Sequence, residues 1–528
     1  MSQTLARRVL ALALVTLLAA CGGPTPPPPP PTGGLVVRPV ADDRFEGSAI
    51  WELDASGLLE GKEVETRLWH LGDVDAQSWS NVVSRGYGHG GTFDVGITAA
   101  LKDGTILTAE ATVTVDDLPY DYWGDPPTLV NQTPGGAEMP LDFLVYWSVS
   151  ADGRYVAFDT SAAGLPDVDT NGASDVYVKD LETGALTLAS ADGDGKATGG
   201  AGPVIISGDA TRVAYRAGNL VAVVTLATGD TALLDDPDGY QQIRPVGLSH
   251  DGSRLVMGAH TTNNPLDAAY LIDIAGPSFT RLGAVGESTW ADSSPVDISA
   301  DGDVVVFRTD GPLVPEDDNE ALDLYAYRYS TGDVALVSAN PAGEPGDKSS
   351  GAYGPVASGD GRYVVFSTEA ANLSPRATEN DGEFEPAEDI YRKDLVTGEV
   401  ELVSTNALGD LADDDAILPT ISGDGRYVAF GAYALNLAPH FDDPDWCYFE
   451  VCANGYAYVK DVVTGRVALV SVGEDETTPD DWDQIEPHIS ADGRYVVFYS
   501  SATNLGYGTL AGDWGLFRAA NPLWEEPD

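Results

Sequence analysis

Short apolar runs rich in β-branched and aromatic residues recur along the chain after residue 126, and polar turns separate them. Seven times a serine, one further residue and Asp-Gly, or a near match, stand between two such runs. Asp-Gly between β-rich runs predicts a hairpin, because glycine adopts a positive φ without a Cβ clash and aspartate tolerates the turn. The seven turns begin, 42 to 68 residues apart, at Ser150, Ser207, Ser249, Ser299, Ser358, Ser422 and Ser490.

Each repeat is long enough for four strands, which we name A to D in chain order. In the first repeat these strands are expected at Leu144 to Ser150, Arg154 to Asp159, Asp175 to Asp180 and Ala185 to Ser190. Strand B recurs as an apolar Tyr-Val-x-Phe segment in the last three repeats, which indicates a core strand. A unit of about 40 or more residues built only of strands predicts a β-propeller, in which neighbouring blades bury each other's faces.

The last repeat ends without a strand D, because the chain finishes soon after a strand C near Trp514 to Arg518. A matching strand stands at the other end, where Thr128 to Asn131 is similar to the D strands of later repeats. Exchange of this first strand into the last blade would remove the exposed edges of an open sheet. The pattern therefore predicts an all-β fold with a seven-bladed propeller over residues 127–521, closed by first-to-last strand exchange and followed by a tail at 522–528.

Two of the turns carry a longer pattern, Pro-x-Ile-Ser-x-Asp-Gly, at Pro419 to Gly425 and Pro487 to Gly493. This pattern resembles the signature of the TolB-type, WD-like β-propeller family, and the resemblance covers about three quarters of the chain. The second repeat departs from it, because Ala210 stands where the turn glycine is expected. The resemblance implies a propeller fold. It implies no particular function, since propellers serve both as binding modules and as enzymes.

Residues 34–117 have the alternating runs and glycine turns of a small β-sandwich. They contain Leu53-Asp54-Ala55-Ser56-Gly57, Trp69-His70-Leu71-Gly72-Asp73, Tyr87 and Gly91-Thr92-Phe93-Asp94-Val95. These segments resemble the PKD (polycystic kidney disease) domain family, although Val74 replaces the second glycine that usually follows the aspartate. The resemblance implies an Ig-like spacer or adhesive module outside the cell, without catalytic activity. Residues 118–126, rich in aromatic and proline residues, predict a linker to the repeats.

The first twenty residues predict an export signal, because two arginines precede an apolar run from Val9 to Ala20. The ending Leu18-Ala19-Ala20-Cys21 resembles the bacterial lipoprotein signal, which implies cleavage after residue 20 and acylation of Cys21. A plain signal peptide or a short membrane anchor is the alternative, although a spanning helix needs roughly 20 apolar residues. Residues 21–33 predict an extended, proline-rich spacer. Because Gly22 follows the cysteine, the resemblance favours the outer membrane or cell surface.

The chain is strongly acidic. Its formal net charge is −55, and loss of the two arginines of the signal changes this to −57. Such a charge argues against nucleic acid or bare anionic membrane as a partner. It suits cation binding, basic partners or plain solubility in a salty exterior.

The sharpest local pattern lies between strands B and C of the first repeat. It is Asp167-Val168-Asp169-Thr170-Asn171-Gly172, with Asp175 three residues further on. Alternating oxygen ligands followed by glycine are typical of the start of a calcium loop. A full EF-hand is excluded, because Val178 stands where its bidentate glutamate would be. Two interpretations stay open: a shorter Ca²⁺ site with ligands Asp167, Asp169, Asn171 and Asp175, and an Asx-rich turn that caps strand C.

Two cysteines remain after Cys21, and they are Cys447 and Cys452 in the longest predicted loop. In an oxidising, exported compartment these two predict a local disulfide rather than a metal pair, since no other cysteine exists and the nearest histidine is His440.

Support for catalysis is weak, because the chain contains no Gly-x-Ser-x-Gly elbow and its histidines are scattered. His488 and Arg244 could face the central channel, but residues of these types are more often satisfied structural residues, which is the favoured interpretation. We expect a monomeric, lipid-anchored binding or scaffold protein that recognises an envelope protein or polysaccharide through long acidic loops. The alternative is a propeller enzyme that acts on glycans or peptides.

Overall fold

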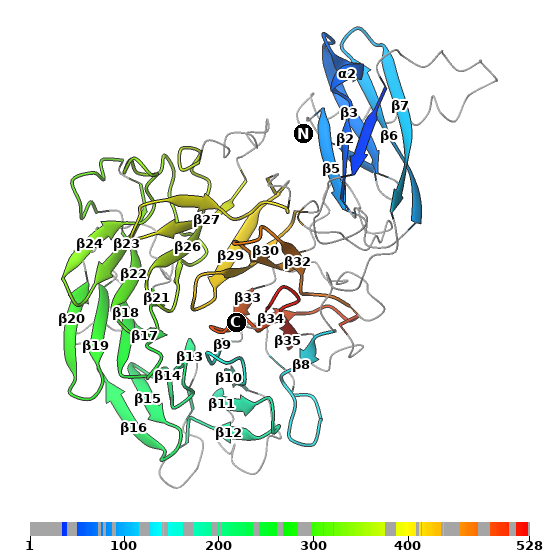
Figure 1. The fold of residues 1–528 in the computed structure, drawn as a ribbon. Coiled ribbons are helices and arrows are strands. Elements are labelled where there is room, and N and C mark those ends of the chain that lie inside the picture. Colours follow the sequence, from blue (N-terminus) through cyan, green and yellow to red (C-terminus); the bar gives the residue numbers. More distant parts are fainter. Residues whose placement is uncertain are drawn as a thin grey trace. The chain divides into compact units, whose positions relative to one another are not determined.

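In the computed structural model (Figure 1) the chain divides into two compact units, one built on residues 52–83 and 92–113 and the other on residues 114–528. Apart from the short helix α2 (Ser56–Leu59), the regular structure of the described residues is β-strand. The structure describes residues 34–39, 50–71, 75–77, 81–86, 91–115, 126–139, 141, 146–161, 173–191, 199–200, 202–235, 242–260, 268–282, 297–309, 311–319, 321–374, 387–407, 411–412, 414–434, 437, 455–473, 486–505 and 514–525.

The strands between residues 36 and 115 form two sheets, a smaller one with the order β1-β2-β5 and a larger one with the order β4-β3-β6-β7. Trp69 of β3, Leu53 of β2 and Val113 of β7 have no exposed surface, so both sheets contribute to a hydrophobic interior. The strands are β1 (Val36–Pro39), β2 (Ile50–Asp54), β3 (Val64–Leu71), β4 (Asp75–Gln77), β5 (Val82–Gly86), β6 (Gly91–Leu101) and β7 (Ile106–Val115).

The described strands of the second unit form seven antiparallel sheets of four strands each, which we number 1 to 7 in the order of their turn serines. The order from A to D holds in each sheet. Sheets 1 to 4 contain β9 (Trp147–Val149), β10 (Tyr155–Thr160), β11 (Asp175–Asp180) and β12 (Leu186–Leu188); β13 (Val204–Ile206), β14 (Arg212–Ala217), β15 (Leu220–Thr225) and β16 (Asp230–Leu234); β17 (Gln242–Leu248), β18 (Arg254–His260), β19 (Ala268–Asp273) and β20 (Ser278–Leu282); and β21 (Asp297–Ile298), β22 (Val304–Thr309), β23 (Asp323–Arg328) and β24 (Asp333–Leu336).

Sheets 5 to 7 contain β25 (Val356–Ala357), β26 (Tyr363–Thr368), β27 (Asp389–Asp394) and β28 (Val400–Leu402); β29 (Ala416–Ile421), β30 (Tyr427–Ala432), β31 (Tyr456–Asp461) and β32 (Val467–Leu469); and β33 (Pro487–Ile489), β34 (Tyr495–Ser500), β35 (Gly515–Ala520) and β8 (Thr128–Leu129). Each A strand contacts the A strand of the next sheet, and β33 contacts β9 (Figure 1). The A strands therefore surround a common axis, which is the arrangement of a β-propeller.

The strand from the other end of the chain is present in sheet 7. There β8 pairs with β35, with Leu129 opposite Phe517. Asn131, which is fully buried, extends this pairing: its Oδ1 accepts the Leu516 N–H at 2.9 Å, and its Nδ2 donates to the Met139 carbonyl at 2.7 Å. The predicted exchange of Thr128 to Asn131 into the last repeat is thus seen in the structure.

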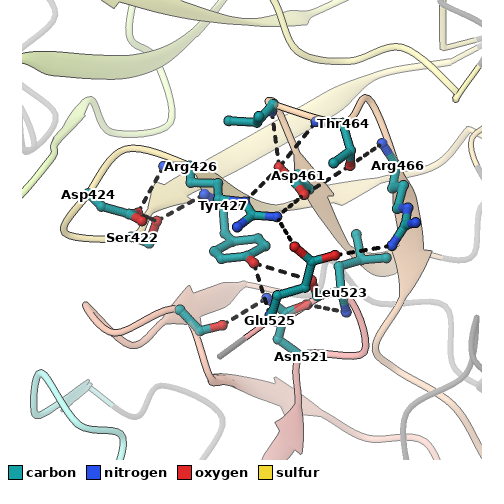
Figure 2. Close-up of polar contacts among 12 residues, drawn as sticks. Ser422, Asp424, Arg426, Tyr427, Asp461, Thr464, Arg466, Asn521, Leu523 and Glu525 are labelled. Atoms are coloured by element: carbon teal, nitrogen blue, oxygen red, sulfur yellow. Dashed lines mark hydrogen bonds and ion pairs between the residues drawn. The ribbon is translucent and has the colours of Figure 1, made fainter. Parts of the chain in front are cut away.

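The serine and aspartate of each turn hold the hairpin together from inside. In sheet 6 the Ser422 hydroxyl donates to Asp424 Oδ1 and accepts the Tyr427 N–H, while Asp424 Oδ1 also accepts the Arg426 N–H (Figure 2). The same serine-to-aspartate bond is present in all seven turns, at 2.5 to 2.8 Å. The repeated pattern therefore encodes a self-contained hydrogen-bonded turn.

The seven turns also bind one another. Six of the seven junctions between neighbouring turns have a backbone hydrogen bond, and at the seventh a Cβ on Gly359 would lie 3.0 Å from Gly423 Cα. Such close approach explains why the residue after the serine is glycine or alanine in every turn except that of His250. The bonds join Ala151 N to Gly208 O, Asp209 N to His250 O, His250 N to Ala300 O, Ala300 N to Gly359 O, Gly423 N to Ala491 O and Asp492 N to Ala151 O.

The last described residues pack on sheet 6, although the sequence predicted only a tail from residue 522. The Tyr427 hydroxyl donates to the Leu523 carbonyl and accepts the Glu525 N–H, both at 3.2 Å (Figure 2). The Glu525 carboxylate lies 2.8 Å from Arg426 and 3.5 Å from Arg466. The end of the chain therefore ties sheet 7 to sheet 6.

Candidate functional site

The connections between the strands of sheets 1 to 7 lie on two opposite faces of the propeller. The A-to-B and C-to-D turns share one face, which we call the turn face, and the B-to-C and D-to-A connections share the other, which we call the loop face. On the turn face, neighbouring A-to-B turns form backbone hydrogen bonds with one another. The loop face is where the sequence predicts long acidic loops, and the strand ends that carry these loops lie within the described residues.

Of the predicted calcium ligands, only Asp175 lies within the described residues; Asp167, Asp169 and Asn171 lie outside them. Asp175 begins β11 and is 1% exposed. Its Oδ1 accepts the Ser190 hydroxyl at 2.8 Å and the Gly199 N–H at 3.1 Å, and its Oδ2 has no hydrogen-bond partner. The two contacts of Oδ1 are those of a carboxylate that ties strand C to the end of strand D.

The same arrangement recurs in sheets 4 and 5, where Asp323 and Asp389 begin strand C and accept a hydroxyl from Ser338 and Ser404, respectively. In sheet 4 the neighbouring Asn319 is internally satisfied, since its Oδ1 accepts the Ala321 N–H and its Nδ2 donates to Gly346 O. Within the described part of the chain, no group of three or more His, Cys, Asp or Glu residues is arranged to hold a metal ion. The described aspartates at the start of strand C thus cap that strand, and three of the four predicted Ca²⁺ ligands lie outside the described residues.

Residues two positions before the turn serines link successive A strands near the axis. Ser148 and Thr420 each accept a backbone N–H of the next sheet's strand A, at 2.8 and 3.1 Å. Asp297 does the same, because its Oδ2 accepts the Ala357 N–H at 2.9 Å. These side chains satisfy N–H groups on the inner edge of the neighbouring sheet, which strand pairing leaves free.

His488 occupies the equivalent position in sheet 7. Its ring lies 4.2 Å from the Trp147 ring of sheet 1, and its Nε2 lies 3.8 Å from the Glu486 carboxylate. Burial raises the pKa of Asp297 to about 6, against the influence of the Ala357 N–H and of His488. Burial acts in the same direction on Glu486, but the hydrogen bond and charge of His488 outweigh it and hold that pKa below its usual range. We call Trp147, Asp297, Glu486 and His488 the axial cluster.

From the sequence, both His488 and Arg244 could face the central channel. The structure places His488 in the axial cluster, whereas Arg244 lies on β17 of sheet 3. Asp297 and Glu486 were not singled out, because nothing in the sequence distinguishes them from the many other acidic residues. Their position relative to the turn serine, two and four residues before it, is the signal that could have found them.

A second group of acidic residues lies on the loop face between sheets 5 and 6. We call it the tyrosine–carboxylate cluster, and it contains Tyr353, Ser367, Glu369, Glu388 and Asp415. Glu388 and Asp415 meet directly, because the Glu388 N–H donates to Asp415 Oδ1 at 2.8 Å. Tyr353 is 39% exposed, and its pKa is raised by burial and by the charges of the three carboxylates.

Glu388 is the most perturbed member of this cluster. Burial, followed by the charges of Glu369, Asp415 and Asp389, raises its pKa to about 7, and the Ser367 hydroxyl acts in the opposite direction. The Oε2 atom of Glu388 and the hydroxyl of Ser367 are both buried. The cluster thus places the carboxyl groups of Glu369 and Asp415 beside the half-buried carboxyl group of Glu388.

The raised pKa of Glu388 predicts a dependence of stability on pH. The folded protein keeps a proton on Glu388 up to about pH 7, whereas the unfolded chain releases it near the ordinary value of 4.5. This group therefore lowers the stability as the pH rises between these values. We expect Glu388→Gln to remove that loss, so that the variant is more stable than the parent at pH 8 but not at pH 4. Urea unfolding at both pH values measures this, and parallel pH profiles would contradict it.

Three further predicted positions lie outside the described residues. They are Cys21, for which lipidation was predicted, and Cys447 and Cys452, for which a disulfide was predicted. The described part of the chain has no helix of the length and apolarity that crossing a membrane requires.

No protein-family model matches the chain, and no curated protein matches it. Among solved structures, it is similar to TolB from Acinetobacter baumannii at 12% identity, covering 71% of this chain and 75% of that one with a TM-score of 0.32. An oligogalacturonate lyase from Vibrio parahaemolyticus is similar at 13% identity, covering 82% of this chain and 98% of that one, with a TM-score of 0.44.

The β-propeller domain of the Trilobed protease from Pyrococcus furiosus is similar at 15% identity, covering 71% of this chain and 93% of that one, with a TM-score of 0.43. The sheets, their closed order and their shared axis define this chain as an all-β protein with a propeller fold. A propeller fold by itself implies no particular activity.

Proposed function

We propose that the protein is a lipid-anchored, extracytoplasmic binding protein that recognises an envelope protein or polysaccharide through its loop face. Residues 1–20 are the signal, Cys21 carries the lipid at the outer membrane or cell surface, and residues 21–33 are the spacer. A PKD-like sandwich at 34–117 and a linker at 118–126 lead to a monomeric, seven-bladed propeller over residues 127–521. The proposal includes a disulfide between Cys447 and Cys452. It also includes a Ca²⁺ site with the ligands Asp167, Asp169, Asn171 and Asp175.

The observation that carries this proposal is the contrast between the two faces. On the turn face, the serines, aspartates and backbone groups of the A-to-B turns form hydrogen bonds within and between these turns. The loop face presents the exposed rings of Tyr146 and Tyr353, and the carboxyl groups of Glu388 and Asp415 lie near Tyr353. Exposed aromatic rings beside acceptor groups are typical of recognition surfaces, because each ring offers contact area at a small cost in side-chain entropy.

A second candidate function, glycan or peptide cleavage, is favoured by the axial cluster. Its two carboxylates have pKa values displaced in opposite directions, raised at Asp297 and lowered at Glu486, as an acid and a base require. However, one oxygen of Asp297 accepts the Ala357 N–H of the next sheet. The hydroxyl groups of Ser148 and Thr420, which are neutral, make the same kind of bond at the equivalent positions of other sheets. A bridging role accounts for Asp297 without catalysis, so binding is the function the geometry favours.

A photo-crosslinking amino acid at Tyr146 of the loop face tests the proposal in cells that export the full chain. We expect a covalent adduct with an envelope component in the membrane fraction. The matched control is Val396, which is 72% exposed on a C-to-D turn of the turn face and should give at least fivefold less adduct.

Cys21→Ser should move both the protein and its adduct out of the membrane fraction. Equal adduct yields from the two faces, or none from either, would contradict binding through the loop face. Turnover of a glycan or peptide library that is lost in both Asp297→Asn and Glu486→Gln would instead establish the enzyme.

A further inference from the structure

On the turn face, an arginine links one sheet to the next at five of the seven junctions in the described part of the chain. Its guanidinium group donates to the backbone carbonyl of the turn glycine in the following sheet, at 2.6 to 3.4 Å. The pairs are Arg212 with Gly252, Arg254 with Gly302, Arg328 with Gly361, Arg392 with Gly425 and Arg518 with Gly153. We call this repeated contact the arginine clamp.

The junction between sheets 6 and 7 is built differently. Val459, which is fully buried, stands in β31 of sheet 6 at the position that Arg392 has in β27 of sheet 5. The Gly493 carbonyl of sheet 7 instead accepts a side-chain N–H of Asn521 at 2.7 Å. Because Asn521 directly follows β35 of sheet 7, this bond stays within one sheet and does not replace the link that the arginine clamp makes elsewhere.

The residues after Asn521 make that link. Leu523, which is 5% exposed, packs in the same hydrophobic cluster as Val459. The Tyr427 hydroxyl of sheet 6 donates to the Leu523 carbonyl and accepts the Glu525 N–H, both at 3.2 Å (Figure 2). The Glu525 carboxylate also pairs with the two arginines of sheet 6 that Figure 2 labels. A short segment that leaves sheet 7 therefore binds sheet 6 through apolar, hydrogen-bonded and ionic contacts.

This segment can detach without the loss of a strand from either sheet. It follows the last residue of β35 and contains no strand itself. Its link to sheet 6 depends on side-chain contacts near the surface, since the Glu525 side chain is 53% exposed. Such contacts open more readily than a strand ladder in a buried core. The arginine clamp differs, because four of its five arginines lie in strands B or C with intact pairing on both sides and the fifth, Arg328, ends strand C.

We propose that residues 521–525 are a latch, and that release of this latch opens the propeller between sheets 6 and 7 while the junctions with an arginine clamp stay closed. The latch is a conformational device of the turn face. The inference goes beyond the proposed recognition through the loop face and is independent of it, because it uses none of the loop-face residues.

Two amides report whether this junction is open. The Gly423 N–H of sheet 6 donates to the Ala491 carbonyl of sheet 7 at 2.7 Å, and the Ile489 N–H of sheet 7 donates to Thr420 Oγ1 of sheet 6 at 3.1 Å. Both bonds cross the junction near the axis and involve no latch residue. Their hydrogen exchange therefore measures separation of the two sheets and not merely detachment of the latch.

The test compares the full chain with the double variant Tyr427→Phe/Glu525→Gln, which removes the hydroxyl and the negative charge that hold the latch but nearly preserves side-chain size. We expect the Gly423 and Ile489 amides to exchange about tenfold faster or more in this variant. The internal reference is the His250 amide, which donates to the Ala300 carbonyl between sheets 3 and 4 at 2.8 Å, where an arginine clamp is present. Its exchange should not change.

Tyr363→Phe is the matched control. Tyr363 has the place in sheet 5 that Tyr427 has in sheet 6, and both rings lie against the turn glycine of the next sheet. Within the described part of the chain, however, the Tyr363 hydroxyl has no hydrogen-bond partner. This variant should therefore exchange as the parent does at all three amides.

Unchanged exchange of Gly423 and Ile489 in the double variant would overturn the inference. Equal acceleration of the His250 amide would also overturn it, because residues 521–525 would then stabilise the whole fold and not one junction. The same conclusion would follow if Tyr363→Phe accelerated exchange of Gly423 and Ile489 as strongly as the double variant does.

Discussion

Replacement of Gly425 by alanine is expected to lower the free energy of unfolding by about 2 to 5 kcal/mol. Gly425 has a φ of 75°, where an L-residue costs about 1 to 2 kcal/mol. A Cβ there would also lie 2.3 Å from Tyr363 Cδ2 of the preceding sheet. Relief of that clash requires the two sheets to separate or the ring to leave its rotamer, and overpacking of this kind costs about a further 1 to 3 kcal/mol.

Gly465 provides the matched control in the same sheet. Its φ is 76°, but a Cβ at this position would have no atom within 4 Å. Gly465→Ala should therefore show only the backbone cost of about 1 to 2 kcal/mol. Urea unfolding of the three proteins measures the difference. If both alanine variants lose the same stability, packing between sheets does not require glycine at the turn, and backbone conformation alone explains the pattern.

The turn motif illustrates how much the sequence could predict. The hairpins follow from local chemistry, because serine, aspartate and glycine determine the turn within five residues. The contact of a turn with the preceding sheet does not, since it joins residues far apart in the sequence, such as Gly425 and Tyr363. Ala210 shows the difference: it takes a φ of 55° in the second turn, so the turn forms without glycine at a local cost in strain.

The closure of the ring was also predictable, because Thr128 to Asn131 has the pattern of a D strand. Its last residue was not explained by that pattern, since sheets 1, 4, 5 and 6 have serine where sheet 7 has Asn131. The structure supplies the reason. In sheets 4 and 5 that serine reaches an aspartate at the start of strand C, but sheet 7 has Gly515 there, and a larger side chain occupies the space.

The candidate sites were much less predictable than the fold. The tyrosine–carboxylate cluster combines residues from 353 to 415, and the chain contains 83 acidic residues among which composition cannot choose. What distinguishes Glu388 is burial and the proximity of other carboxylates, and both arise only when sheets 5 and 6 pack together. The contact of Glu525 with Arg426 is similar, because charge alone matches that glutamate with any exposed cation.

Asn131→Ala is expected to lower the free energy of unfolding by about 2 to 6 kcal/mol and to loosen the closure of the ring. The side chain is fully buried, and its removal leaves the Leu516 N–H and the Met139 carbonyl without partners. Each buried group left unsatisfied costs about 1 to 3 kcal/mol. Because β8 has only two residues, these side-chain bonds are a large part of what holds the first described strand of this unit in the last sheet.

Thr128→Ala is the control for this prediction, since Thr128 lies in the same strand but is exposed and makes one side-chain bond of 3.2 Å, to the Arg518 carbonyl. An exposed substitution of this kind should change stability by only about 0.5 kcal/mol. Hydrogen exchange of peptides that cover residues 514–520 locates the effect, because opening of the closure exposes the Leu516 amide before the other sheets unfold. Faster exchange there in Asn131→Ala, but not in Thr128→Ala, would establish the asparagine as the closure of the propeller. Equal exchange in both variants would place the closing energy elsewhere, in the contacts of Glu525 and Leu523 with sheet 6.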